Sequence, residues 1–196
     1  MNIRIIRKGT IIKIIPYVGG LIFTMVLYLI AWPVPIDPVA WQPLPAPQLE
    51  GQYAINDYLA AVEIIGKDEG IGPEDVDVDD EGRIYGAYLD GTIIRFSANG
   101  ENLGVFANTE GRPLGLDFDT AGNLIIADAK KGLLSADKNG AIRVLATEIN
   151  GTPFGFTDDV DIGPDGMIYF SDASEKFGVH DYRADLFEHR PHGKIL

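Results

Sequence analysis

Acidic residues recur at matched positions in two parts of this chain of 196 residues. Glu74 and Asp75 open one short segment of alternating apolar residues, and Asp158 and Asp159 open another. If both segments occupy equivalent places in a repeated fold, Glu74 and Asp158 should approach each other, with Asp75 and Asp159 one layer deeper. Carboxylates that share a cavity repel one another unless a proton or a cation lies between them.

A hard cation with oxygen ligands would relieve this repulsion. Ca²⁺ takes about 6 to 8 oxygen ligands in flexible geometry, the chain has no cysteine, and its three histidines lie elsewhere. The sequence therefore predicts a calcium ion near these four carboxylates. The alternative is that acids at strand starts only cap turns and meet water, as we expect for residues 79–81.

The elements that must position these residues are repeated β-hairpins. Three segments superpose with their turn glycines in register: 74–88, 114–128 and 158–172. Gly82, Gly122 and Gly166 are 40 and then 44 residues apart. Each segment alternates apolar and polar residues, which is typical of half-buried strands. A helical repeat of this period is excluded because glycine interrupts the chain every few residues.

Further strands are expected between the hairpins, at residues 92–96, 103–106, 133–136 and 141–145. Four short strands in about 40 residues predict one blade of a β-propeller. The blades should span about residues 57–108, 109–150 and 151–196. Propellers usually close with about 4 to 8 blades, so we expect an all-β fold with about three blades of a larger ring. Missing C-terminal blades of a longer chain, or a second chain, would close it.

The first 50 residues lie outside this predicted ring. Residues 14–32 carry no charge, and as a helix they would just cover a hydrocarbon layer of about 30 Å. Residues 1–32 are therefore predicted to form a basic cytoplasmic tail and one transmembrane helix, which leaves the blades on the periplasmic or lumenal side. A cleaved signal peptide and a buried core helix are the alternatives.

A proline-rich segment follows at residues 33–50. Proline removes amide donors and fixes φ, so we expect a stiff extended linker there. The net charge of the whole chain is −13, which argues against nucleic acid as a partner.

Three stretches of the sequence carry a resemblance to a known family. They are GPEDVDVDDEGRIY, GRPLGLDFDTAGNLIIADAKKGLL and FGFTDDVDIGPDGMIYFSDASEKF. Together they resemble the six-bladed propellers of the strictosidine synthase-like group, within the superfamily of gluconolactonases of the SMP-30 type and paraoxonases. The resemblance covers about residues 56–196, and a membrane-anchored animal relative shares the layout. It implies a ring of six blades, of which about half is absent here.

The resemblance also implies roles for individual residues. Glu74 matches the glutamate that binds the catalytic calcium in hydrolytic members, whereas Asp158 stands where those members usually have asparagine. Asp75 and Asp159, with the backbone carbonyl of Leu116, match a second, structural calcium site. The remaining catalytic ligands would lie beyond residue 196.

The implied activity is calcium-dependent hydrolysis of lactones or esters by a completed ring. The alternatives are a calcium-stabilised propeller without activity and, least expected, an amine-aldehyde condensing synthase. No catalytic base can be assigned in this segment. We interpret His180, His189 and His192 as exposed loop residues, and Tyr169 and Phe170 as aromatics that pack between blades.

Overall fold

The computed structural model describes residues 8–196, with side chains from residue 15 onward. The chain divides into two compact units, Met1–Asp37 and Pro38–Leu196. The predicted basic tail falls largely at residues 1–7 and so lies outside the described residues.

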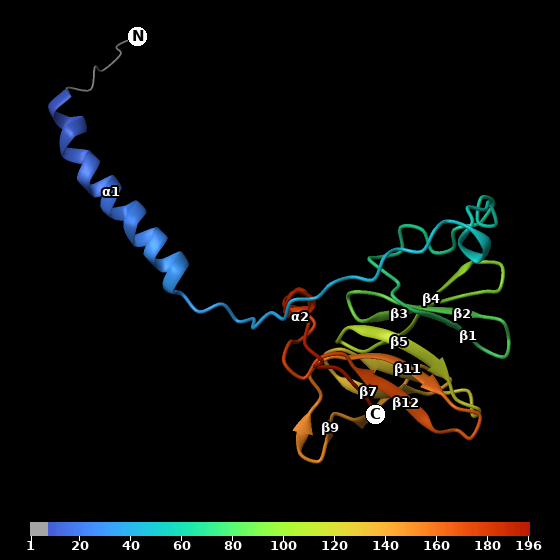
Figure 1. The fold of residues 1–196 in the computed structure, drawn as a ribbon. Helices are drawn as coiled ribbons and strands as arrows, with labels where there is room; N and C mark the ends of the chain where they lie inside the picture. The colour runs from blue at the N-terminus through green and yellow to red at the C-terminus, as the bar shows by residue number, and fades with distance from the viewer. Residues whose placement is uncertain (1–7) are drawn as a thin grey trace, which may run out of the picture. The chain divides into compact units, whose positions relative to one another are not determined.

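One helix, α1 (Lys8–Ala31), forms the first unit (Figure 1). Its described apolar side chains are exposed, for example Phe23 at 69% and Ile30 at 78%. Among the residues that the structure describes, no helix combines the length and the apolar character that a membrane crossing requires. The transmembrane helix predicted over residues 14–32 is therefore not supported.

The segment between the helix and the sheets has almost no regular structure. Residues 33–50 contain neither helix nor strand, as their prolines predict. A short 3-10 helix, η1 (Gly51–Tyr53), follows them.

Two four-stranded antiparallel sheets form the first part of the second unit, and we call them blade 1 and blade 2. Blade 1 contains β1 (Val76–Val78), β2 (Ile84–Ala87), β3 (Thr92–Phe96) and β4 (Asn102–Asn108). Blade 2 contains β5 (Pro113–Phe118), β6 (Leu124–Asp128), β7 (Gly132–Ala136) and β8 (Ile142–Ala146). Strands are adjacent in chain order in both sheets, so the strands predicted from the repeats are confirmed.

The third sheet, blade 3, is less regular. It contains β11 (Thr157–Ile162), β12 (Ile168–Asp172) and β13 (Lys194–Ile195), and β9 (Glu148–Ile149) and β10 (Thr152–Pro153) form a separate ribbon before it. The connection from β12 to β13 is long and contains the helix α2 (Tyr182–Glu188). The equivalent connections in blades 1 and 2 are short turns.

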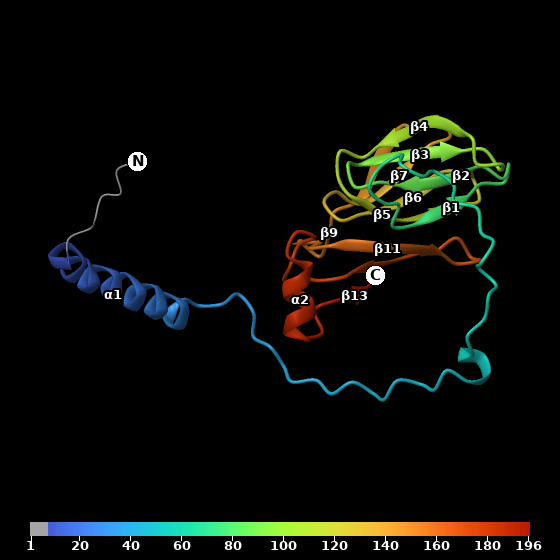
Figure 2. The same ribbon diagram turned by 90° about the horizontal axis from the view of Figure 1, so that it is seen from above.

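The first strands of the three blades, β1, β5 and β11, lie side by side in both ribbon views (Figures 1 and 2). We call them the inner strands. The described sheets form a mostly-β stack that does not close into a ring.

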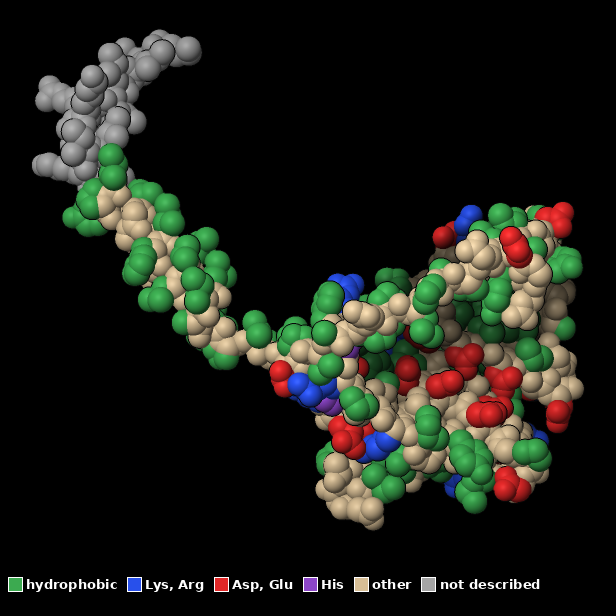
Figure 3. Space-filling view, viewed as in Figure 1, with side chains coloured by type: hydrophobic (Ala, Val, Ile, Leu, Met, Phe, Trp, Pro, Cys, Tyr) green, Lys and Arg blue, Asp and Glu red, His purple; other side chains and the backbone are tan. Residues whose placement is uncertain are grey.

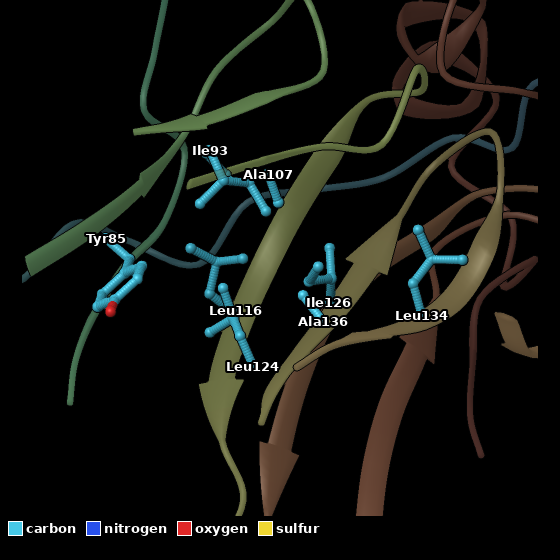
Figure 4. Packing of buried hydrophobic residues seen from close by; sticks show 9 residues of the cluster. Tyr85, Ile93, Ala107, Leu116, Leu124, Ile126, Leu134 and Ala136 are labelled. Carbon is cyan, nitrogen blue, oxygen red and sulfur yellow. The ribbon is translucent and has the colours of Figure 1, made fainter. Parts of the chain in front are cut away.

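Apolar side chains fill the two spaces between the blades. Tyr85 and Ile93 of blade 1 pack against Leu116, Leu124 and others of blade 2 (Figure 4). The ring of Tyr85 meets Phe106 and Phe118 edge-on, with centroids 5.0 and 4.9 Å apart. Ile125, Ala127 and Leu133 on the other face of blade 2 pack against Val160 of blade 3. Alternate residues along the strands of blade 2 thus point to opposite faces, one packed against blade 1 and the other against blade 3.

The turn between β1 and β2 depends on Asp79. Its carboxylate accepts hydrogen bonds from the backbone of Glu81 and Arg83, from the Arg83 guanidinium and from the Tyr85 hydroxyl. Burial opposes ionisation, but these donors outweigh it and hold the pKa of Asp79 below its usual value. Asp79 therefore caps the turn as predicted, but its side chain is only 10% exposed rather than open to water.

Candidate active site at the ends of the inner strands

Glu74 and Asp158 line one cavity of about 530 Å³. Glu74 precedes β1 and Asp158 lies at the start of β11, so the repeated hairpins bring the two acids to the same end of the stack. Arg112, just before β5, also lines the cavity. In the sequence it lies between Glu74 and Asp158. Leu114 and Phe156 supply part of its apolar wall.

Two cationic side chains, Arg112 and Lys130, line the cavity with the acidic pair, and Arg112 is the one that pairs with Glu74. Its Nη2 lies 3.5 Å from Glu74 Oε2, and its side chain is 12% exposed, whereas that of Glu74 is 56% exposed. Asp128, which is fully buried, accepts a hydrogen bond of 2.9 Å from the Arg112 backbone N–H. The buried carboxylate of Asp128 therefore fixes the loop that presents the guanidinium.

Asp158 is under electrostatic strain. Burial raises the pKa of this carboxyl, the charges of Glu74 and Asp159 raise it further, and Arg112 only partly opposes them. The like-charge repulsion expected from the sequence is therefore present at Asp158.

The carboxylates of the second predicted layer, Asp75 and Asp159, accept hydrogen bonds from backbone N–H groups. Asp75 Oδ2 accepts a hydrogen bond of 2.8 Å from the backbone N–H of Leu116, and Asp75 Oδ1 accepts one of 2.8 Å from Val76. Asp75 and Leu116 therefore do meet, but through the amide of Leu116 rather than its carbonyl. Asp159 is exposed, and its Oδ1 accepts a hydrogen bond of 2.9 Å from the Val160 N–H.

Gly115 allows β5 and β11 to approach this closely. A Cβ atom at this position would lie 2.7 Å from the Cα of Asp159 and 2.8 Å from the backbone nitrogen of Val160. Backbone atoms cannot yield as a flexible side chain does, so only glycine fits here.

A third layer of aspartates was not singled out from the sequence. Asp77 Oδ2 accepts a hydrogen bond of 2.9 Å from Phe118 N, and Asp117 Oδ2 accepts one of 2.6 Å from Ile162 N. Asp161 holds the same place in β11. These residues align in all three repeats, a signal that was available, and Figure 3 shows acidic side chains gathered over the inner strands.

Burial also raises the pKa of Asp117. The charges of Asp77 and Asp161 add to this effect, and the hydrogen bond from Ile162 opposes it.

The connection between β12 and β13 forms another wall of the cavity. Val179, His180, Tyr182 and Leu186 line it, the last two from α2. Ser174 Oγ donates a hydrogen bond of 2.8 Å to Asp185, which holds α2 against the strand end. The sequence patterns did not predict this helix.

The three histidines have different environments. His180 is exposed and lines the cavity, and His189 ends α2 in the left-handed conformation. His192 Nε2 lies 3.0 Å from Oε1 of Glu188, and its side chain is 20% exposed. Interpreting all three as exposed loop residues was therefore wrong for His192, because its ring lies against the carboxylate of Glu188, which is 1% exposed.

Of the two aromatic residues predicted to pack between blades, Tyr169 and Phe170, only Phe170 does so. Phe170 packs against the core shared by blades 2 and 3 and meets Phe154 edge-on at 5.2 Å. Tyr169 is 47% exposed on the opposite face of blade 3, because neighbouring strand residues point to opposite faces.

The residues present fit part of a calcium site. Two oxygen-bearing side chains, Glu74 and Asp158, face one cavity. Burial is the main cause of the raised pKa of Asp158, and the charges of Glu74 and Asp159 add to it. Within residues 15–196, however, no group of three or more acidic or histidine side chains is arranged to hold a metal ion. This segment would therefore contribute two carboxylates to a ligand set of about 6 to 8 oxygens.

Two family models match the chain. The model described as "Strictosidine synthase-like, N-terminal" matches residues 51–96, and "Strictosidine synthase" matches residues 158–196. The protein STRICTOSIDINE SYNTHASE-LIKE 4 of Arabidopsis thaliana is 36% identical over 170 residues, which cover 83% of this chain and 45% of that protein. The adipocyte plasma membrane-associated protein of Danio rerio is 26% identical over 204 residues, covering 94% of this chain and 48% of that protein.

A gluconolactonase of Xanthomonas campestris has a TM-score of 0.44 and 18% identity over 47% of this chain and 32% of its own. That likeness is too low to support any argument about function. The chain spans about half the length of the sequence relatives it matches, 45% and 48% in the two cases. The family models, the sequence relatives and the repeated hairpins agree that the chain belongs to the strictosidine synthase-like family of β-propeller proteins.

Proposed function

We propose that the cavity lined by Glu74 and Asp158 belongs to a calcium-dependent hydrolase of lactones or esters. The observation that carries the proposal is the convergence of these two carboxylates on one cavity of about 530 Å³ with an apolar wall. An apolar pocket with a few convergent polar groups is the usual form of a small-molecule site.

Glu74 and Asp158 would hold the cation in this proposal. When bound, calcium would polarise the substrate carbonyl and stabilise the oxyanion that develops there. The second carboxylate, at the place where related hydrolases usually have asparagine, adds negative charge and should strengthen cation binding.

The remaining wall residues bind and orient the substrate. Leu114, Phe156 and Leu186 offer apolar surface to the body of a lactone or aryl ester. Arg112, 3.5 Å from Glu74, holds that carboxylate at the cavity. No side chain in this segment is assigned as the base that activates water.

A second, structural cation near Asp75, Asp159 and Leu116 remains part of the proposal. Asp75 already ties β1 to β5 through the Leu116 N–H. A cation that bridged Asp75 and Asp159 would therefore reinforce a junction between blades rather than take part in chemistry.

Hydrolysis of aryl esters and lactones by the full chain tests this proposal, with calcium and with a chelator. We expect turnover only with calcium, and Glu74→Gln should abolish it without changing the circular dichroism spectrum. Glu101→Gln is the matched control, because Glu101 is exposed and lies outside the cavity. Turnover that survives either the chelator or Glu74→Gln would contradict the proposal.

A calcium-stabilised scaffold without activity is the second candidate. The observation that favours it is the use of Asp75, Asp77 and Asp117 as acceptors for backbone N–H groups of the next blade. If calcium raises the melting temperature and no substrate is turned over, the scaffold is the better description.

We further propose that the chain associates with membranes through α1. Leu21, Phe23 and Leu29 are 71, 69 and 66% exposed on it, and relatives from Danio rerio and Salmo salar are named plasma membrane-associated proteins. The full chain should float with phosphatidylcholine vesicles in a density gradient. Replacement of Leu21 and Leu29 by aspartate should leave it at the bottom, and equal flotation of both forms would refute this assignment.

A further inference from the structure

One buried carboxylate fixes two of the loops that surround the cavity of Glu74 and Asp158. Asp128, at the end of β6, is fully buried, and its Oδ1 accepts hydrogen bonds from three backbone N–H groups. They belong to Arg112 at 2.9 Å, Lys130 at 2.9 Å and Lys131 at 3.0 Å. The loop before β5 and the turn between β6 and β7 are therefore held through their main chain, which leaves their side chains available to the cavity.

Arg112 and Lys130 differ in their partners, although both line the cavity. The guanidinium of Arg112 lies 3.5 Å from Glu74. Lys130 is exposed, and within residues 15–196 its ammonium group forms no ion pair. Asp185, another carboxylate of the cavity, accepts a hydrogen bond of 2.8 Å from Ser174 Oγ instead. The charge of Lys130 is therefore available to a ligand.

The positive charge of Lys130 is also separate from the acidic pair. The charges that shift the pKa of Asp158 come from Glu74, Asp159 and Arg112, and Lys130 is not among them. One cavity thus offers an acidic end and, apart from it, an unpaired ammonium group. Its volume of about 530 Å³ lies within the range of about 300–1,000 Å³ that is usual for small-molecule sites.

We propose that the substrate of this cavity carries a carboxylate, and that the ammonium group of Lys130 binds it. The inference deepens the proposed function and rests on it for the identity of the site, since the ester or lactone group would lie at the acidic end. An ammonium group offers one positive charge and three N–H donors, which suits a monoanion. A phosphate dianion would call for a second cation, and Arg112 already pairs with Glu74.

Binding of benzoate, compared with its neutral isostere benzamide, tests the proposal without any turnover. Isothermal titration calorimetry of the full chain, in mild detergent and with calcium, measures both affinities. We expect benzoate to bind about tenfold more tightly, because the pair with Lys130 is a charge-assisted hydrogen bond. Lys130→Met should remove this preference, and Lys130→Arg should retain most of it. A carboxylate held by calcium instead would keep its preference in Lys130→Met, which would overturn the proposal.

Lys131→Met is the matched control. Lys131 is exposed, lies outside the cavity and donates its backbone N–H to the same aspartate. Its substitution removes the same charge from the same turn, and neither methionine variant loses a backbone N–H, so both should fold. The preference for benzoate should be unchanged in Lys131→Met. Equal loss in the two methionine variants, or no preference for benzoate in the wild type, would overturn the proposal.

Hydrolysis of 4-acetoxybenzoate and 4-acetoxybenzamide separates this inference from the proposed function. The ratio of their kcat/KM values is compared between the wild type and Lys130→Met, so that the intrinsic reactivity of each ester cancels. We expect KM for the anionic ester to rise about tenfold in the variant, with kcat little changed. Turnover of neither ester, with benzoate binding that depends on Lys130, would refute the hydrolase and leave the ligand assignment standing. Turnover of both esters with the same ratio in the two proteins would refute the ligand assignment alone.

Discussion

Asp117 gives the sharpest test of how the blades are held together. Its Oδ2 accepts the 2.6 Å hydrogen bond from Ile162 N, and it faces the charges of Asp77 and Asp161. Asp117→Ala removes the bond and leaves the Ile162 N–H without its partner. Hydrogen bonds to charged groups contribute about 1.5–3 kcal/mol, and relief of the repulsion offsets part of this loss. We expect the free energy of unfolding to fall by about 1–2 kcal/mol at pH 7.

Asp117→Asn separates the bond from the charge. The amide oxygen can still accept from Ile162 N, while the repulsion from Asp77 and Asp161 disappears. A neutral hydrogen bond contributes about 1 kcal/mol, so this variant should lie within about 1 kcal/mol of the wild type at pH 7, or above it. Urea unfolding of the full chain in mild detergent, followed by circular dichroism, measures both variants.

The pH dependence of this effect has a definite sign. The pKa of Asp117 is raised above 3.8 in the folded state, so the folded chain holds this proton more readily than the unfolded chain. Ionisation of Asp117 therefore lowers stability as the pH rises from 3.8 through the raised pKa. The advantage of Asn over Asp should be complete above that pKa and should vanish below pH 3.8. If Asn destabilises as much as Ala does, or if Ala has no effect, the account of the junction is wrong.

Three further outcomes follow from the fold. Gly115→Ala should lower the free energy of unfolding by about 1–3 kcal/mol in urea titrations, because its Cβ would press on the Asp159 backbone. Asp79→Asn should lower the melting temperature at pH 7. The pKa of Asp79 is lowered in the folded state, so the stability from its ionisation is present above pH 3.8. That stability is lost as the pH falls through the folded-state pKa. Lys176→Met removes a cation from the carboxylate of Glu188, which is 1% exposed, and should cost about 1–3 kcal/mol by chemical denaturation.

Each of these outcomes has a control in the same chain. Gly19→Ala should leave the unfolding of the sheets unchanged, because a Cβ atom added there would meet no atom within 4 Å. Asp181→Asn should show no loss at pH 7, and Lys67→Met should leave stability unchanged because Lys67 has no ion pair among residues 15–196. If a control variant loses as much stability as the variant it is matched to, the loss reflects a general effect of charge or volume and not the contact described.

The strands could be predicted because their signals are local. Alternating side chains and turn residues such as Asp79 and Gly82 specify a hairpin without help from the rest of the chain. The predicted strand at residues 92–96 matches β3 at both ends. The meeting of Glu74 and Asp158 at one cavity was also predictable, since equivalent residues of stacked repeats share one end of the stack.

Arg112 could not be found in the same way. It lies in a turn, so no periodicity marks it, and its importance comes from a neighbour, Glu74, that is remote in sequence. The helix α2 is similar, because seven residues form a stable helix only through tertiary contacts. Those contacts, from Ser174 to Asp185 and from Lys176 to Glu188, become visible only when the chain is folded.

The aspartates of the third layer were missed for another reason. Asp77, Asp117 and Asp161 stand at polar positions of alternating strands, and such positions are usually assigned to solvent. The alignment of the repeats contained them, but only the folded chain shows that two of them bind the neighbouring blade.

The hydrogen bonds between blades constrain the sequence on the acceptor side only. Their donor is a peptide group, which almost every residue possesses, and only the acceptor depends on a particular side chain. One whole blade could therefore be exchanged for another only if an aspartate survives at each seam together with the apolar face that packs against the next blade and the glycine at position 115. The hydrogen bonds themselves fix only one side chain each, and the apolar faces carry most of the sequence requirement at a joint.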